Sequence, residues 1–183
     1  MKRQKRAAAI HDISCFGKCS LTVALPILSA AGIEAAVIPT AVLSTHTGGF
    51  TDFTYRDLTA DLRPIMAHWK RLGLQFDAVY SGYLGSFEQV AIVRDFIGMF
   101  RSEGTLVLVD PAMADGGKLY KTFEPPFVEE MKGLCTHADL IVPNITEAAM
   151  LTGETYREGP YDKAYIERLL HGLLSLGAKQ AVL

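Results

Sequence analysis

Short apolar runs alternate with longer segments of helical periodicity along most of this chain. The runs have the length of buried strands, and apolar residues recur between them with the 3.6-residue period of a helix. This alternation is typical of βαβ units, so we predict an α/β fold with a mostly parallel sheet and helices on both faces. We expect the strands at Ala7–His11, Ala35–Pro39, Ala78–Ser81, Thr105–Asp110, Leu140–Val142 and Lys179–Leu183.

The segments between these strands contain amphipathic helices. One apolar stripe lies on a helix that we expect to end near Gly73, and it comprises Leu58, Leu62, Ile65, Met66, Trp69 and Leu72. A second stripe comprises Ile166, Leu169, Leu170, Leu173 and Leu174. Apolar residues at this spacing form one face of a helix and pack into a core. No repeat or linker interrupts the pattern, so we predict a single domain over residues 1–183.

Two serines mark expected helix starts. Ser20 is a suitable N-cap residue. Ser86, followed three residues later by Gln89, predicts a capping box. The residues that we expect to face the core are Leu21, Leu25 and Leu28 in the first of these helices and Val90, Val93, Ile97 and Phe100 in the second.

The charge balance argues against several classes of partner. Lys and Arg number 18 against 20 Asp and Glu, which gives a net charge of -2. This balance creates no global field that would hold a nucleic acid or an anionic membrane. The most apolar stretch, residues 22–43, is interrupted by Pro26, Gly32, Glu34 and Pro39, so it is not expected to span a membrane. We therefore expect a soluble protein without nucleic-acid or membrane partners.

The cysteines favour a reducing compartment. Their number is 3, which is odd, and a chain of this length needs no disulfide to build a core, so we expect a cytoplasmic protein. We interpret all of them as buried thiols, because no second cysteine pair completes a tetrahedral metal site: Cys15, Cys19 and Cys135. Other side chains assigned to surface or packing positions are His68, His137, His171, Tyr55, Tyr161 and Tyr165.

Candidate functional residues follow the strands, because ligands of open α/β sheets bind beyond the carboxyl ends of the strands. The first such loop is HDISCFGKCS, residues 11–20, in which Gly17 lets backbone N–H groups approach a ligand. It is not a P-loop, since Asp12 replaces the required glycine and Cys19 replaces the Ser or Thr that would bind Mg²⁺. No G-x-G-x-x-G follows any strand, which argues against a dinucleotide-dependent oxidoreductase.

Two further loops are rich in glycine and short polar side chains. Residues 42–51, VLSTHTGGFT, predict a mobile flap on which His46 stacks on or hydrogen-bonds to an aromatic ring. A solvated hairpin with an uninvolved His46 is an equally good interpretation. Residues 81–86, SGYLGS, place glycines on both sides of Tyr83 and permit close backbone approach, although periodicity alone favours a plain strand-to-helix turn capped by Ser86.

Acidic residues follow the fourth and fifth strands. Asp110 and Asp115 lie in the first of these loops and Glu147 in the second, so the fold would bring them to one edge of the sheet. Carboxylate oxygens are ligands that Mg²⁺ prefers, and phosphoryl transfer uses such an edge to bind a metal–nucleotide complex. A capping box of Asn144 and Glu147 would account for both residues without a metal.

Four segments together resemble the pyridoxal/pyridoxamine (vitamin B6) kinases of the ribokinase-like superfamily. In chain order they are LSTHT (residues 43–47), SGYLGS (81–86), DPAMAD (110–115) and VPNITE (142–147). The resemblance extends from Ala7 to the end of the chain. It implies a doubly wound α/β fold and transfer of the γ-phosphate of ATP to the 5′-hydroxymethyl group of pyridoxal, pyridoxamine or pyridoxine.

The resemblance also implies roles for individual residues. The wall around the pyridine ring would comprise Asp12, Ser14, His46, Thr47 and Tyr83, with Tyr120 closing over the ring. Mg²⁺ and a monovalent cation such as K⁺ would be held near the nucleotide phosphates by Asp110, Asp115 and Glu147, and nucleotide contacts would come from Asn144 and Glu147. We also expect a homodimer.

One family feature is missing from this sequence. In the family, a Gly-x-Gly-Asp segment of the C-terminal part supplies an anion hole and the Asp general base, and no such segment occurs here. We therefore expect the base to lie beyond Leu183 and the sheet to be truncated after about the sixth strand. Anion-hole donors contribute about 10²–10³-fold each and a base about 10²–10⁴-fold, so we predict that the chain alone is inactive or nearly so. An apolar strand edge near Val182 predicts self-association.

Two other functions stay open from the sequence. A hydroxymethylpyrimidine kinase of the same superfamily would act on a related ring. A non-catalytic fragment that binds a B6 vitamer, or that pairs with another subunit, would need no general base. Tight vitamer binding without ATP hydrolysis would favour the fragment.

Overall fold

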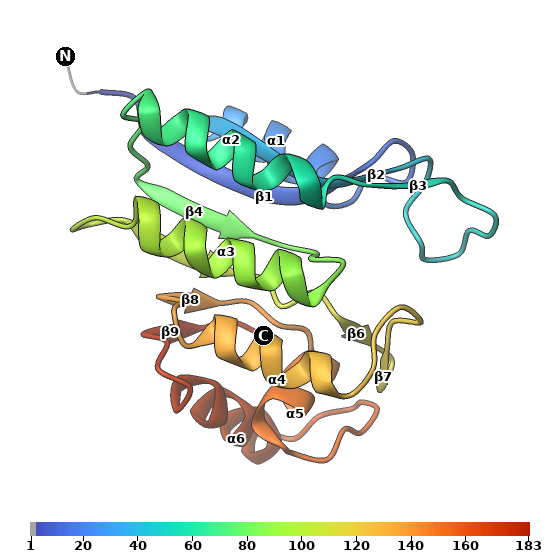
Figure 1. Cartoon of the computed structure of the whole chain (residues 1–183). Coiled ribbons are helices and arrows are strands. Elements are labelled where there is room, and N and C mark those ends of the chain that lie inside the picture. Colours follow the sequence, from blue (N-terminus) through green and yellow to red (C-terminus); the bar gives the residue numbers. More distant parts are fainter. Residues whose placement is uncertain (1–2) are drawn as a thin grey trace. The chain divides into compact units, whose positions relative to one another are not determined.

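A computed structural model describes residues 3–183. The chain divides into two compact units, Met1–Thr105 and Leu106–Leu183, and each is described by itself (Figure 1). The single domain over residues 1–183 stays a prediction.

Unit 1 contains four strands in the order β3-β2-β1-β4. Their bounds are β1 Arg6–Ser14, β2 Glu34–Leu43, β3 Tyr55–Asp57 and β4 Ala78–Ser81. β1 pairs in parallel with both β2 and β4, whereas β3 is antiparallel to β2. The central strand β1 is buried over most of its length, which explains its unbroken apolar run.

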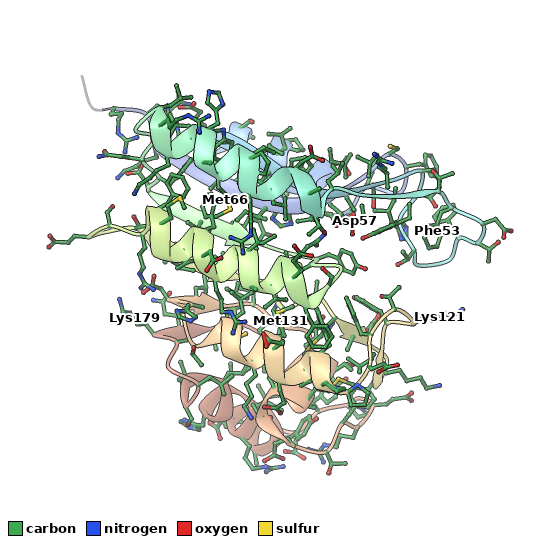
Figure 2. The ribbon with its side chains drawn as sticks, in the orientation of Figure 1. Phe53, Asp57, Met66, Lys121, Met131 and Lys179 are labelled. Atoms are coloured by element: carbon green, nitrogen blue, oxygen red, sulfur yellow. The ribbon has the colours of Figure 1, made fainter. Side chains whose placement is uncertain are left out.

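The helices of unit 1 cover both faces of its strands. They are α1 Leu21–Ala30, α2 Thr59–Arg71 and α3 Phe87–Phe100, with α1 behind the strands and α2 in front of them (Figure 1). Met66 of α2, labelled in Figure 2, is buried. An aromatic cluster between α2 and α3 completes this core: Trp69, Phe76, Phe96 and Phe100.

Unit 2 is built around the parallel strands β5, β8 and β9, in that order. The strands are β5 Leu106–Val109, β6 Ala114–Asp115, β7 Lys118–Leu119, β8 Leu140–Ile141 and β9 Gln180–Ala181. The helices are α4 Pro126–Cys135, α5 Ile145–Thr152 and α6 Lys163–Leu174, with α5 packed against both α4 and α6. β6 and β7 form a short antiparallel hairpin. Met131 of α4, labelled in Figure 2, is fully buried.

The predicted mostly parallel α/β fold is confirmed in both units. Each predicted strand corresponds to one of β1, β2, β4, β5, β8 and β9, and β4 has the predicted bounds. The prediction omitted β3 and the β6–β7 hairpin. These strands are two or three residues long and largely exposed, so they carry no apolar alternation that a sequence pattern could show.

Several local predictions need correction. The Ser20 side chain makes no cap hydrogen bond, because Ser20 has a left-handed backbone with φ 52° and forms a bridge to Ile13. Ser86 does cap α3, but Gln89 completes no box with the Ser86 N–H and accepts from the Gly85 N–H instead. Of the cysteines predicted to be buried, only Cys135 is buried; Cys15 is exposed and Cys19 is half-buried, because both lie in the loop after β1. Some side chains that were predicted to pack are exposed instead: Leu25, Leu72, Leu174, Tyr55 and Tyr161. They are exposed because the packed face of the helix is narrower than the apolar stripe, or because the residue lies at the edge of its element.

Among the described residues, every helix is too short or too polar to cross a lipid bilayer.

Candidate functional site

The carboxyl end of β1 presents buried polar side chains in unit 1. Asp12 and Ser14 are both buried, and the Ser14 hydroxyl donates to Asp12 Oδ2 at 3.1 Å. The second carboxylate oxygen, Oδ1, is buried and has no hydrogen-bond partner among the described residues. A buried polar atom without a partner is costly, so Asp12 is a strong candidate for contact with a ligand.

Other unpartnered polar atoms lie near the same strand ends. Ser81 ends β4 opposite Ile10, two residues before Asp12, and its buried hydroxyl has no partner in the described part of the chain. His11 Nε2 and Thr45 Oγ1 are also buried without partners there. Sequence reasoning assigned no role to Ser81, His11 or Thr45. Their position along the chain could have identified them as candidates, since they lie near the carboxyl ends of strands, where ligands bind.

His11 is held as a neutral imidazole. Its ring packs edge-on against Tyr80 at 4.3 Å between centroids, and burial lowers its pKa to about 4. Gly82 makes this position possible, because a Cβ there would lie 2.2 Å from His11 Nδ1.

The flap was predicted over residues 42–51, but Val42 and Leu43 still belong to β2. The loop itself comprises residues 44–54 between β2 and β3, and it extends away from the sheet of unit 1 (Figure 1). The Ser44 N–H donates to the Thr54 carbonyl at 3.1 Å, and the Thr54 N–H donates to Ser44 Oγ at 2.9 Å. These two bonds close the base of the loop. Phe53, labelled in Figure 2, lies in the loop near this base.

His46 connects the flap to the loop after β1. Its backbone N–H donates to the Phe16 carbonyl at 3.0 Å, and its Nδ1 accepts from the Gly48 N–H at 3.0 Å. The ring lies so close to Gly17 that a Cβ there would be 1.9 Å from His46 Cδ2, and Gly17 has φ +109°. Two features therefore require a glycine at position 17: its positive φ and the His46 ring, which leaves no room for a Cβ.

An exposed group of aromatic rings surrounds His46. The His46 and Phe50 rings meet edge-on at 5.1 Å, and Phe50 meets Phe16 at 5.8 Å. Phe16 is 66% exposed, which is unusual for a side chain of this size. Thr47, the other predicted flap residue, is exposed.

Tyr83 lies in the loop after β4, and Tyr55 lies close to it. Partial burial, with smaller contributions from Tyr83, Asp57 and Asp12, raises the pKa of Tyr55 to about 12. The Tyr55 hydroxyl also lies where a Cβ on Gly85 would approach it to 2.6 Å. Two of the residues predicted to surround the ring, Asp12 and Tyr83, thus lie close enough to Tyr55 to affect its pKa. Two others, His46 and Thr47, belong to the flap.

In unit 2, Asp110 and Glu147 follow the adjacent parallel strands β5 and β8. Burial raises the pKa of Asp110 to about 6. Burial also raises the pKa of Glu147 to about 7, and the Asp110 charge adds to the effect against the opposing backbone hydrogen bonds. A cation bound near these two carboxylates would stabilise their charged forms.

Glu147 also completes the capping box of α5. Its Oε2 accepts from the Asn144 N–H at 2.9 Å, while Asn144 Oδ1 accepts from the Glu147 N–H at 2.9 Å. Glu147 Oε1 accepts from the Met113 N–H at 3.1 Å and the Ala114 N–H at 3.4 Å. Asn144 Nδ2 donates to the Ala114 carbonyl at 2.8 Å. The box predicted from sequence is present, and it also fixes the start of the β6–β7 hairpin.

Asp115 lies on the exposed turn of the hairpin. Its Oδ1 accepts from the Gly116 N–H at 2.8 Å. The turn is attached to α5, because the Gly117 N–H donates to Thr146 Oγ1 at 3.0 Å. The ring of Tyr156 covers Gly117, where a Cβ would lie 2.6 Å from Tyr156 Cδ1. Sequence reasoning missed Thr146 and Tyr156.

Tyr120 follows β7 and is half-buried. Its N–H donates to the Met113 carbonyl at 2.9 Å, and its ring lies 6.3 Å from that of Phe123. Over residues 3–183, no group of three or more His, Cys, Asp or Glu side chains has the arrangement of a metal site. The structure thus brings together Asp110 and Glu147, and the Mg²⁺ assignment for Asp110, Asp115 and Glu147 stays a prediction.

Comparison with known proteins identifies relatives of the chain. A crystal structure of a Bacteroides thetaiotaomicron protein assigned as a phosphomethylpyrimidine kinase is 44% identical, with a TM-score of 0.92 over 97% of this chain and 61% of that one. A second crystal form of that protein contains pyridoxal. Pyridoxal kinase from Lactobacillus plantarum is 36% identical, with a TM-score of 0.84 over 97% of this chain and 62% of that one.

A curated relative has a defined vitamer activity in its name. The pyridoxine/pyridoxal/pyridoxamine kinase of Bordetella avium is 30% identical over 148 residues, 75% of this chain and 48% of its own length. The chain spans about half the length or less of the curated relatives that it matches. The phosphomethylpyrimidine kinase family model matches residues 25–183, so this chain belongs to the phosphomethylpyrimidine kinase family.

Proposed function

We propose that the protein is a B6-vitamer kinase that transfers the γ-phosphate of ATP to the 5′-hydroxymethyl group of pyridoxal, pyridoxamine or pyridoxine. The observation that carries this proposal is the pair of half-buried Asp110 and buried Glu147 after adjacent parallel strands, with the pKa values of both raised. Such a pair is suited to a cation beside nucleotide phosphates. The pyridoxal bound to the Bacteroides thetaiotaomicron relative supports the choice of vitamer.

The ring would bind at the carboxyl ends of β1 and β4 in unit 1. Asp12 Oδ1 would accept a hydrogen bond from the ring hydroxyl or from a protonated ring nitrogen, because this oxygen is buried and unpartnered among residues 3–183. Ser14 would orient the carboxylate through its bond to Oδ2. His46, Thr47 and Tyr83 would surround the ring, and the flap would exclude water from it.

The residues of unit 2 suit Mg²⁺ bound with water molecules. Asp110 offers a carboxylate that accepts no hydrogen bond from the described residues. Glu147 accepts three backbone N–H groups and would act mostly through an intervening water, which agrees with the preference of Mg²⁺ for retaining waters. Mg²⁺ would neutralise phosphate charge when bound. Asn144 and Glu147 would orient the nucleotide, and the role of Tyr120 at the ring stays a prediction.

Four finer statements stay predictions. They are the use of K⁺, the cytoplasmic location, the homodimer and the low activity of this chain by itself. A sizing column would test the homodimer, which predicts elution at twice the mass of 20.0 kDa.

A hydroxymethylpyrimidine kinase is the second candidate, because the family model that matches residues 25–183 is that of phosphomethylpyrimidine kinase. A pyrimidine presents an exocyclic amine and ring nitrogens in place of the single pyridine nitrogen. Asp12 would accept a hydrogen bond from either ring, so the present geometry does not favour this candidate over the first.

Calorimetric titration separates the candidates. We expect the chain to bind pyridoxal more tightly than hydroxymethylpyrimidine by about tenfold or more, which corresponds to about 1.4 kcal/mol. A parallel assay for pyridoxal 5′-phosphate with ATP and Mg²⁺ should detect little product from this chain. Tighter binding of the pyrimidine would favour the second candidate, and binding of neither ring would contradict both.

A further inference from the structure

Gln89 is fully buried in α3, and its side-chain amide contacts three other segments of unit 1. Its Oε1 accepts from the Gly85 N–H at 2.7 Å. Its Nε2 donates to the Thr40 carbonyl of β2 at 3.0 Å and to Thr59 Oγ1 of α2 at 2.9 Å. One side chain therefore connects the start of α3 to β2, to α2 and to the loop after β4.

The loop that Gln89 contacts contains Tyr83. The Thr40 hydroxyl donates to the Tyr83 carbonyl at 3.3 Å, and the Thr40 carbonyl accepts from Gln89. Thr40 therefore links Gln89 to Tyr83. The Tyr55 hydroxyl lies against Gly85 from another side. The backbone on both sides of Leu84 is thus held by a buried network whose centre is Gln89.

This use of Gln89 differs from an ordinary helix cap. A glutamine at this position of a capping box would accept from the N–H of the cap residue, Ser86. Here the Gln89 side chain accepts from the N–H of Gly85, the residue before Ser86, and the Ser86 hydroxyl still accepts from the Gln89 N–H at 3.2 Å. The start of α3 and the preceding loop are therefore joined, so a shift of Gln89 would move the loop.

We propose that Gln89 is a positioning residue of the vitamer site, which sets the backbone of residues 82–86 and thereby the place of Tyr83. The inference rests on the proposed function, in which Tyr83 contacts the pyridine ring. Gln89 itself contacts no substrate. Loss of its amide would leave the Gly85 N–H and the Thr40 carbonyl without this partner, and the loop would gain alternative conformations.

Three variants test the proposal. Gln89→Met has similar length and removes all three side-chain hydrogen bonds. Gln89→Glu retains an acceptor for the Gly85 N–H but loses both donated bonds. Thr59→Val is the matched control, because it removes the bond to α2 and leaves the bond to Gly85 intact. Pyridoxal affinity, amide hydrogen exchange at Gly85 and unfolding by urea are measured for each.

We expect Gln89→Met to weaken pyridoxal binding by about tenfold and to accelerate exchange at Gly85 by about tenfold or more. Gln89→Glu should recover a large part of both losses. Thr59→Val should lower stability towards urea while changing pyridoxal affinity and Gly85 exchange less than about twofold. A purely structural Gln89 would instead give affinity losses that follow stability in all three variants, and that result overturns the proposal.

The exchange measurement separates this inference from the proposed function. If the unmodified chain binds no vitamer, the proposed function fails. Gly85 exchange then decides the positioning role by itself: acceleration in Gln89→Met but not in Thr59→Val supports it, and equal exchange in all variants overturns it.

Discussion

The polar groups at the strand ends of the two units are used in opposite ways. In unit 2, Glu147 accepts three backbone N–H groups and fixes both α5 and the hairpin that precedes it. In unit 1, Asp12 and Ser81 each contain a buried oxygen without a partner among the described residues. The first arrangement stabilises the fold, and the second leaves hydrogen-bonding capacity for a ligand.

This difference separates stability from binding. Substitutions in the Glu147 network should unfold the protein before they reveal anything about a ligand. Substitutions of the unpartnered atoms in unit 1 should hardly change stability, because they remove no hydrogen bond of their own.

Glu147→Ala should lower the free energy of unfolding by about 3 kcal/mol or more, because it leaves three N–H groups, two of them buried, without this acceptor. Urea unfolding measures the change. Glu129→Ala in α4 is the control, since Glu129 is exposed, and it should change stability by less than about 0.5 kcal/mol. Equal effects of the two substitutions would contradict the structural role of Glu147.

His11 should make unit 1 sensitive to acid. Burial lowers its pKa from 6.5 to about 4, so between these values the unfolded chain binds a proton that the folded chain does not. Stability from this group is complete above pH 6.5 and is lost as the pH falls towards 4, by about 3 kcal/mol over the window. His11→Gln should flatten this part of the profile. A profile of urea midpoints that is equally steep in the variant would contradict the assignment.

Gly17→Ala should displace His46 and so disturb the flap. The new Cβ would meet the ring at 1.9 Å in addition to the strain of a positive φ. Gly49→Ala has the strain alone, since φ is +79° and nothing lies within 4 Å of its Cβ position. Both should cost about 1–2 kcal/mol of stability, and only Gly17→Ala should weaken pyridoxal binding, by about tenfold. Equal affinities would show that His46 has no part in binding.

Asp12→Asn should have the smallest effect on stability, within about 1 kcal/mol, because Oδ1 has no partner to lose and the Ser14 bond can persist. Pyridoxal affinity should nevertheless fall by about tenfold. A variant that lost stability but kept its affinity for pyridoxal would show that Asp12 stabilises the fold and does not bind the ligand.

The sequence predicted the fold well where residues are buried and periodic. The strands around β1 and β8 were identified because unbroken apolar runs mark strands covered on both faces. Glu147 was identified both as a site residue and as part of a capping box, because position relative to Asn144 determines the cap. β3 was not predicted, because its residues Tyr55, Arg56 and Asp57 are exposed and pair only with the edge of β2.

The partners of the site could not be predicted in the same way. Gln89 was expected to bond with Ser86, and its actual contacts with Thr40 and Thr59 lie 49 and 30 residues away along the chain. The unpartnered state of Ser81 depends on every neighbour that the fold brings near it. Such features arise from tertiary packing, which no local pattern encodes.

Amide mapping by NMR with two ligands tests whether a vitamer and a nucleotide–metal complex bind at separate strand ends. Pyridoxal should shift the amide signals of residues near Asp12 and Tyr83, and ADP with Mg²⁺ should shift those near Asp110 and Asn144. Each ligand should saturate its own set of signals. Pyridoxal that shifts no signal in unit 1, or ADP and Mg²⁺ that leave the signals near Asp110 unchanged, would contradict the assignment of a vitamer site and a cation site to these strand ends.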